Sequence, residues 1–299
     1  MKLLITGAWR CSKDRLDEIV KMGHEIVFMQ SEWDELPCDP TEIEGVICNG
    51  LFIYHDIQSF SNLRYIQLVS AGYDRVPTEY IAAHGIETRN ARGVYSKPMA
   101  EYAVCGVLQI YKRSKFFYEN QKRHNWEKKR DLLELCGKTV LIVGCGSVGT
   151  ECAKRFKAFD CLVYGVDIKE SDCAFFDKFF GLKDLDSILS VSDIVVLCLP
   201  LDKSTYRFFN ASRFEKLKSG CVFVNIARGA VVDEGALIDA LDNKLMGAVL
   251  DVFEQEPLSV GSKIWDMENV IIMPHNAFIG DGNDKRLFEL IVNNLRGRQ

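Results

Sequence analysis

Short apolar runs rich in β-branched residues recur along the whole chain, and the segments between them have helical or turn patterns. A run that is apolar at nearly every residue is typical of a strand buried on both faces, as in a parallel sheet covered by helices. A first series predicts five strands, in residues 2–7, 25–30, 45–49, 65–70 and 86–90. A second series predicts six strands, in residues 139–144, 161–167, 193–199, 221–227, 247–252 and 270–273. The alternation therefore predicts an α/β protein with two doubly wound parallel sheets.

The length of 299 residues is typical of two domains. Between the two strand series, residues 98–126 have a helical pattern, and Pro98 suits its first turn. A last helix is expected near residues 286–295, and we expect it to pack back on the first domain. The predicted domains are thus residues 1–97 with 276–299, and residues 98–275, with a cleft between their sheets.

Composition and charge exclude several classes of protein. The net charge of −5 favours neither a nucleic acid nor a membrane surface as partner. Residues 112–130 contain eight Lys/Arg, but acidic and aromatic residues interrupt them, as is typical of a solvated helix or a subunit arm. The eleven cysteines are scattered without a C-x-x-C pair, which favours free thiols in a reducing compartment. No metal site is expected, because His and Cys show no ligand spacing. Without a signal peptide or membrane span, the chain is predicted to be cytoplasmic.

A glycine-rich turn follows the first strand of the second series. Residues 144–149 read GCGSVG, which fits G-x-G-x-x-G between a strand and a helix pattern, the arrangement that binds a pyrophosphate. Asp167 closes the next strand, 21 residues after Gly146, where a carboxylate binds the ribose hydroxyls and repels a 2′-phosphate. We therefore predict NAD in preference to NADP, although Lys169 lies close by. The alternative is that these glycines only allow close helix–strand packing.

Ionisable residues follow three late strands of the same series. Arg228 follows residues 221–227, Glu256 lies in the segment after residues 247–252, and His275 follows residues 270–273. Because ligands bind at the carboxyl ends of parallel strands, these side chains could converge. A histidine can exchange the proton of a hydroxyl group, a carboxylate can orient it, and a guanidinium can hold a substrate carboxylate. Taken singly, each has an ordinary structural reading as a surface charge, a turn residue or a structural histidine.

At these residues the chain resembles the D-isomer-specific 2-hydroxyacid dehydrogenase family. The matching blocks include VSAGYD (69–74), MAEYAV (99–104), GKTVLIVGCGSVG (137–149), VNIARGAVVDEGALIDAL (224–241) and GAVLDVFEQEPL (247–258). The resemblance implies a flavodoxin-like substrate domain, a Rossmann NAD-binding domain, and a homodimer formed through an arm at about residues 100–130. It also implies transfer of a hydride between the nicotinamide and a small 2-oxo or 2-hydroxy acid, such as glyoxylate, hydroxypyruvate or a pyruvate-like acid.

The resemblance also assigns site residues. Its catalytic arginine, glutamate and histidine fall on Arg228, Glu256 and His275. The implied cofactor contacts are Gly144, Gly146, Ser147, Val148, Gly149, Asp167, Pro200, Thr205, Ala227 and Asp251, and the implied substrate contacts are Ser70, Ala71, Gly72, Tyr95 and Phe278.

The chain departs from parts of the family pattern. Relatives acting on 3-phosphoglycerate place an arginine after the third strand, where this chain has Asn49, Gly50 and Leu51, and formate-oxidising relatives have glutamine where it has Glu256. Both departures count against those substrates. A second hypothesis is an NAD-sensing scaffold or corepressor of the same fold without physiological turnover, and only a turnover measurement separates it from the enzyme.

Overall fold

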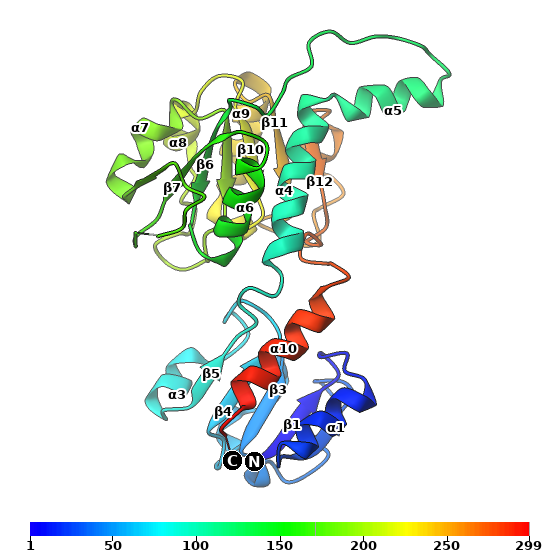
Figure 1. Cartoon of the computed structure of the whole chain (residues 1–299), viewed down its shortest axis with the longest axis vertical. Helices are drawn as coiled ribbons and strands as arrows, with labels where there is room; N and C mark the ends of the chain where they lie inside the picture. The colour runs from blue at the N-terminus through cyan, green and yellow to red at the C-terminus, as the bar shows by residue number, and fades with distance from the viewer. Residues whose placement is uncertain (171, 299) are drawn as a thin grey trace. The chain divides into compact units, whose positions relative to one another are not determined.

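The structure, a computed structural model, describes residues 1–170 and 172–298. The chain divides into two compact units, drawn in Figure 1. Unit 1 comprises Met1–Tyr95 and the segment that starts at Gly280, and unit 2 comprises Ser96–Ile279.

Unit 1 is a parallel five-stranded sheet in the order β2-β1-β3-β4-β5, which is the flavodoxin-like order. Its strands are β1 (Lys2–Thr6), β2 (Glu25–Met29), β3 (Gly45–Cys48), β4 (Tyr65–Leu68) and β5 (Glu87–Arg89). Its helices are α1 (Lys13–Lys21), α2 (Leu51–Tyr54), α3 (Thr78–Ala83) and α10 (Asn283–Leu295), with short 3-10 turns at Pro40–Glu42 and Ile57–Ser59. All five strands lie where the apolar runs predicted them.

Both faces of this sheet are covered, because neighbouring residues of a strand point to opposite sides. Leu3 and Ile5 of β1 pack with Leu287 and Ile291 of α10 on one face. Leu4, between them in sequence, packs on the opposite face with residues that follow β3 and β4. The C-terminal helix therefore belongs to the core of the N-terminal unit.

Unit 2 is a parallel seven-stranded sheet in the order β12-β11-β10-β9-β6-β7-β8, a Rossmann order with one added edge strand. Its strands are β6 (Thr139–Val143), β7 (Leu162–Val166), β8 (Lys178–Phe180), β9 (Ile194–Leu197), β10 (Val222–Asn225), β11 (Gly247–Leu250) and β12 (Val270–Ile272). Its helices are α4 (Ser96–Tyr111), α5 (Ser114–Lys122), α6 (Ser147–Lys157), α7 (Leu185–Leu189), α8 (Ala211–Lys216) and α9 (Glu234–Asn243), with 3-10 turns at Leu182–Asp184, Gly229–Val231 and Lys263–Asp266. The two parallel-sheet domains confirm the predicted fold class.

The sequence patterns missed β8. This strand has only three residues, pairs with β7 alone at the edge of the sheet, and is partly exposed. A run this short carries no periodicity, so only its pairing with Tyr164–Val166 reveals it.

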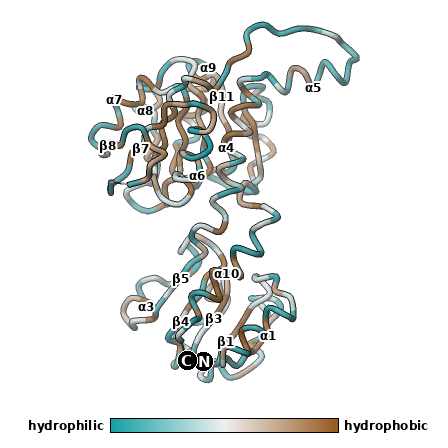
Figure 2. The backbone as a smooth tube through the Cα atoms, viewed as in Figure 1, coloured by the Kyte–Doolittle hydropathy of each residue, from teal (hydrophilic) through white to brown (hydrophobic). Residues whose placement is uncertain are grey.

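The sheet of unit 2 is also packed on both faces. Helices α4 and α6 cover the face that carries Val140 and Ile142, while α7, α8 and α9 cover the face that carries Leu141 and Val143. Figure 2 shows the strands as hydrophobic tube and the segment around α5 as mostly hydrophilic tube. The core therefore lies along the sheet, and α5 lies outside it.

The single helix predicted over residues 98–126 is wrong. The structure has two helices, α4 and α5, which meet at Arg113, whose φ is +53°. A residue in this left-handed conformation interrupts the helical hydrogen bonding, and neither glycine nor proline at this point signals it. Helix α5 ends at Lys122, and the chain then runs back without regular structure to β6.

Within the described residues, no helix combines the length and the apolar character that crossing a membrane requires.

Candidate active site

The predicted glycine turn joins β6 to α6 in unit 2. Gly144 has a φ of +95°, and its N–H donates to Val166 O at 2.9 Å, so the turn is tied to the end of β7. A Cβ on Gly149 would lie 2.1 Å from Gly144 O, whereas one on Gly146 would meet nothing within 4 Å. The first N–H groups of α6 have no partner inside the helix and point with its positive end toward the turn. The turn can therefore hold a pyrophosphate, with open space over Gly146 for its close approach.

Asp167 lies at the end of β7 beside this turn. Its carboxylate accepts hydrogen bonds from Cys145 N and Ile168 N, each at 2.6 Å. These bonds fix the carboxylate at the edge of the turn, where a ribose would follow the pyrophosphate. The geometry fits the predicted ribose contact.

The loop after β9 is held by its own side chains. The Thr205 hydroxyl donates to Pro200 O at 2.7 Å and accepts from Asp202 N at 2.8 Å, and Thr205 is buried. Thr205 thus shapes the loop whose predicted role is cofactor contact. Ala227, another predicted contact, is buried at the end of β10, where its N–H donates to Asn225 Oδ1.

The predicted catalytic residues follow three adjacent strands. β10 pairs with β11, and β11 pairs with β12, all in parallel, so Arg228, Glu256 and His275 come from the same edge of the sheet. The strands that these residues follow are thus neighbours, and the convergence of all three side chains stays a prediction.

Glu256 and His275 form a direct pair. His275 Nδ1 lies 2.7 Å from Glu256 Oε2, and Glu256 Oε1 accepts a hydrogen bond from Phe253 N at 3.1 Å. An ionised carboxylate only accepts, so the proton of this bond belongs to Nδ1, and Nε2 remains for a ligand. The His275 side chain is 41% exposed, so the pair is accessible within unit 2.

Asp251 holds the turn that carries His275. His275 has a φ of +49°, and its N–H donates to Asp251 O at 2.7 Å. The buried Asp251 carboxylate accepts from Asn276 N at 2.7 Å and Ala277 N at 2.9 Å. Burial raises the pKa of Asp251, and these two N–H groups oppose that rise. The structure thus gives Asp251 a positioning role that the sequence did not predict, and its contact with the cofactor stays a prediction.

Arg228 is brought to the Glu256 loop by its neighbour Gly229. A Cβ on Gly229 would lie 1.8 Å from the carbonyl carbon of Phe253, so the two backbone segments are in direct contact. The buried Asn225 supports the turn, because its Nδ2 donates to Arg228 O at 3.2 Å. Sequence reasoning gave Asn225 no role, although its place at the end of a strand before Arg228 was a signal.

The predicted substrate residues Ser70, Ala71, Gly72 and Tyr95 lie in unit 1. Ser70, Ala71 and Gly72 follow β4, where Ser70 Oγ donates to Gly72 O at 3.3 Å and Asn90 Nδ2 donates to Ala71 O at 2.6 Å. The Tyr95 hydroxyl donates to Val69 O. Hydrogen bonds thus stabilise the turn after β4 at the carboxyl edge of this sheet.

Phe278, the remaining predicted substrate residue, lies in unit 2. Its ring stands edge-on to the His275 ring, with centroids 6.2 Å apart. Phe278 is therefore an apolar neighbour of the histidine.

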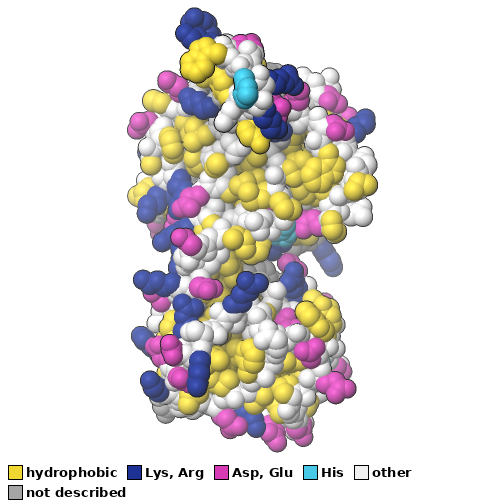
Figure 3. Space-filling view, turned by 90° about the vertical axis from the view of Figure 1, so that its right-hand side faces the viewer, with side chains coloured by type: hydrophobic (Ala, Val, Ile, Leu, Met, Phe, Trp, Pro, Cys, Tyr) yellow, Lys and Arg dark blue, Asp and Glu magenta, His cyan; other side chains and the backbone are white. Residues whose placement is uncertain are grey.

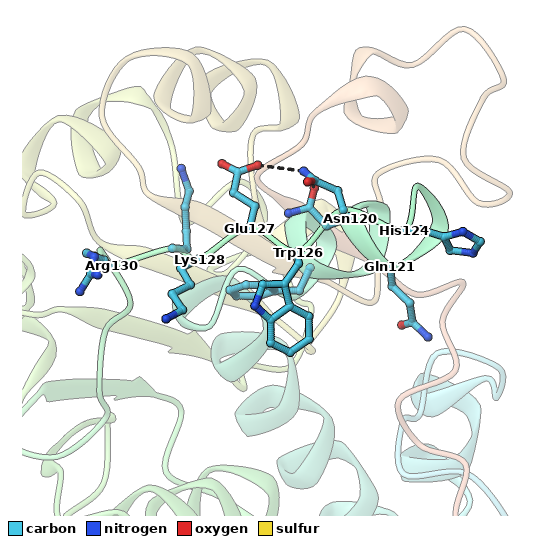
Figure 4. Close-up of a pocket in the computed structure, with 10 residues that line it drawn as sticks. Asn120, Gln121, His124, Trp126, Glu127, Lys128 and Arg130 are labelled. Atoms are coloured by element: carbon cyan, nitrogen blue, oxygen red, sulfur yellow. Dashed lines mark hydrogen bonds between the residues drawn. The ribbon is translucent and has the colours of Figure 1, made fainter.

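A cavity of about 620 Å³ lies away from these residues, beside α5. The side chains of Asn120, Trp126 and Glu127 lie around it in Figure 4, and Asn125 Nδ2 donates to Glu127 Oε2 at 3.1 Å. It is formed where the chain folds back over α5, not at the carboxyl edge of either sheet.

Among residues 1–170 and 172–298, no three or more His, Cys, Asp or Glu residues are grouped so that they could hold a metal ion.

A sheet of this order can bind a dinucleotide at the carboxyl ends of its strands, and a histidine held by a carboxylate there can exchange a proton with a hydroxyl group. Residues 104–277 match the family described as "D-isomer specific 2-hydroxyacid dehydrogenase, NAD binding domain". The chain belongs to this family of NAD(P)-dependent 2-hydroxyacid oxidoreductases, which confirms the resemblance and the predicted class of cofactor.

Three relatives illustrate the likeness. A glyoxylate reductase of Thermofilum pendens is 34% identical over 241 residues, covering 78% of this chain and 71% of the relative. A D-3-phosphoglycerate dehydrogenase of Archaeoglobus fulgidus is 34% identical over 93% of this chain, which spans 53% of that relative. The structure of a D-isomer specific 2-hydroxyacid dehydrogenase of Xanthobacter autotrophicus Py2, in complex with NADPH and MES, is 28% identical with a TM-score of 0.82, covering 99% of this chain and 93% of that one.

Proposed function

We propose that the protein interconverts a small 2-oxo acid and its 2-hydroxy acid with NAD(H), with glyoxylate, hydroxypyruvate or a pyruvate-like acid as substrate. The observation that carries this proposal is the 2.7 Å contact between His275 Nδ1 and Glu256 Oε2 at the carboxyl edge of the nucleotide-binding sheet. Similarity to a glyoxylate reductase supports the substrate class.

Each catalytic residue has a task that its chemistry suits. NAD(H), when bound, supplies the hydride acceptor or donor. His275 Nε2 takes the hydroxyl proton in oxidation and returns a proton to the carbonyl oxygen in reduction. Glu256 holds the ring through Nδ1 and stabilises its cationic form. Arg228 binds the substrate carboxylate through a forked pair and polarises the adjacent carbonyl group.

NAD is the proposed preferred cofactor, because Asp167 presents a fixed carboxylate beside the glycine turn. A 2′-phosphate near this carboxylate would be repelled. The NADPH complex of the Xanthobacter relative makes the comparison of the two cofactors worth measuring.

A homodimer formed through the arm is part of the proposal. The arm, at about residues 100–130, carries Trp126 at 94% exposure and Tyr118 at 58%. In Figure 3 hydrophobic, basic and histidine side chains lie together at the top of the view, where Figure 1 has α5. Large exposed aromatics of this kind are typical of interfaces. The eleven cysteines are scattered without a C-x-x-C pair, which supports a reducing, cytoplasmic compartment.

The test is NADH oxidation by the purified protein with glyoxylate, hydroxypyruvate, pyruvate, 2-oxoisocaproate and 3-phosphohydroxypyruvate, with NADPH in parallel. We expect turnover with at least one of the small acids, and NADH to be preferred. Arg228→Ala and His275→Ala should each lower kcat/KM by about 100-fold or more while NADH binding is retained. Bound NADH without turnover of any acid would reject the enzyme and favour the NAD-sensing scaffold.

A further inference from the structure

Unit 1 contains a buried carboxylate that the proposed chemistry does not use. Glu32 lies in the loop after β2 and is 9% exposed. Its carboxylate accepts three hydrogen bonds, from Thr6 Oγ1 at 2.8 Å, Asn49 N at 2.6 Å and Gly50 N at 2.7 Å. Three donors thus converge on this one carboxylate, which has room for about four.

Two of these donors are consecutive backbone N–H groups at the end of β3. Consecutive N–H groups that converge on one point form a concavity that binds anions. Here the anion is supplied by the chain itself. The loop is fixed in place, because His55 Nε2 lies 2.9 Å from Glu32 O and the Trp33 ring packs edge-on against Tyr54.

This concavity adjoins the turn that is predicted to hold the substrate. β3 pairs with β4, and Val69 N donates to Cys48 O at 2.9 Å, so Asn49 and Ser70 leave neighbouring strands at the same edge. The Arg75 side chain lies beside Gly50, because its Cδ is 3.6 Å from the point where a Cβ on Gly50 would lie. Among the described residues, however, no cation forms an ion pair with Glu32.

We propose that Glu32 fills an anion-binding concavity beside the substrate turn, and thereby restricts the enzyme to 2-oxo acids without a second anionic group. The inference rests on the proposed function, since it concerns which 2-oxo acids unit 1 accepts. A phosphate or carboxylate on the far end of a substrate would find the two N–H groups occupied and a negative charge in place. Glu32 is therefore a specificity-determining residue that acts on the substrate through position and charge.

The first experiment compares kcat/KM for glyoxylate, hydroxypyruvate and 3-phosphohydroxypyruvate. The wild-type protein should prefer hydroxypyruvate over its phosphorylated form by about 100-fold. Glu32→Gln should shift this ratio toward the phosphorylated acid by about tenfold, with glyoxylate turnover changed less than about threefold. Glu35→Gln is the matched control, because Glu35 is an exposed carboxylate of the same loop, and it should leave the ratio unchanged.

Equal turnover of both hydroxypyruvates by the wild-type protein, or an unchanged ratio in Glu32→Gln, would overturn the inference. If glyoxylate is turned over in either case, the proposed function still stands. If the wild-type protein turns over none of the 2-oxo acids, the proposed dehydrogenase function is rejected.

A second measurement is independent of activity. Glu32→Ala leaves the N–H groups without their anion, so acetate should raise its thermal unfolding temperature and not that of Glu35→Ala. An equal effect of acetate on both variants would show that no such anion site exists.

Discussion

At the scale of single residues, hydrogen bonds between side chains, and between side chains and backbone N–H groups, fix the geometry around His275. Glu256 is bonded on one oxygen by Phe253 N and on the other by His275 Nδ1. The Asp251 carboxylate, in turn, fixes the backbone that follows His275. His275 is thus oriented through both its ring and its main chain, as its proposed acid–base role requires.

Glu256→Gln is expected to lower kcat/KM for 2-oxo acid reduction by roughly 100- to 10,000-fold, because a neutral amide does not stabilise the cationic ring. Steady-state kinetics measure the loss, and NADH titration should show unchanged binding. The matched control is Glu254→Gln on the same loop, since Glu254 pairs with Arg207 at 2.9 Å. Equal losses in the two variants would remove Glu256 from its specific role.

At the scale of elements, two glycines allow close contact between segments that carry predicted site residues. Gly229 allows the turn after β10 to touch the loop after β11, and Gly149 allows α6 to approach the turn after β6. These contacts leave no room for a side chain. Gly146 differs, because the space above it is open within the protein.

Gly149→Ala and Gly146→Ala should therefore separate stability from binding. A Cβ at Gly149 meets Gly144 O at 2.1 Å, so we expect a loss of about 1–3 kcal/mol in the free energy of unfolding together with weaker NADH binding.

Gly146→Ala should leave thermal unfolding nearly unchanged and weaken NADH binding by about tenfold or more, because its Cβ would occupy space that the pyrophosphate needs. Thermal unfolding and fluorescence titration give the two readouts. Tight NADH binding by Gly146→Ala would show that the pyrophosphate lies elsewhere.

The C-terminal segment after α10 is tied to β5 by an ion pair between Arg298 and Glu87. The hydrogen bond from Arg298 is the largest of the effects that lower the pKa of Glu87 to about 2. Because the pKa of Glu87 is lower in the folded protein, its ionisation increases the free energy of unfolding. This contribution is complete above about pH 4.5, the ordinary pKa of a glutamate, and is lost as the pH falls toward 2. Both side chains are partly exposed, so solvent screening reduces the effect.

Arg298→Ala should lower the free energy of unfolding by about 0.5–1 kcal/mol at pH 7. The difference in the free energy of unfolding between this variant and the wild-type protein should shrink as the pH falls below 4.5. Denaturant unfolding at several pH values measures this difference. Arg296→Ala, an exposed arginine at the end of the same helix, serves as control and should show no such pH dependence. A difference that persists at low pH would assign the effect to packing and not to charge.

At the scale of the whole molecule, the proposed homodimer concerns the arm. Trp126, which lines the cavity of about 620 Å³ beside α5, is 94% exposed, and Tyr118 of α5 is 58% exposed. Burying two such aromatics in an interface is favourable by several kcal/mol.

Light scattering should therefore give about twice the chain mass of 33.9 kDa, and the double variant Trp126→Ala, Tyr118→Ala should shift the protein toward the monomer. Trp33→Ala is the matched control, because Trp33 is 69% exposed but lies in unit 1. A wild-type monomer, or a double variant that remains fully dimeric, would contradict the arm as the interface.

Sequence alone determined the features that local pattern controls. The strands of both sheets, except β8, follow from apolar runs, and the glycine turn with Asp167 follows from spacing. The three strand-end residues Arg228, Glu256 and His275 could be proposed because parallel strands present their carboxyl ends together.

Only the tertiary structure decided what depends on contacts between segments distant in sequence. The strand β8 exists through its pairing with β7, and the helix break at Arg113 follows no local signal. The hydrogen bonds of Asp251 to the His275 turn and of Glu32 to the end of β3 join residues that no short motif contains. Such contacts arise from three-dimensional packing, because a buried polar group must find its partner wherever the fold places one.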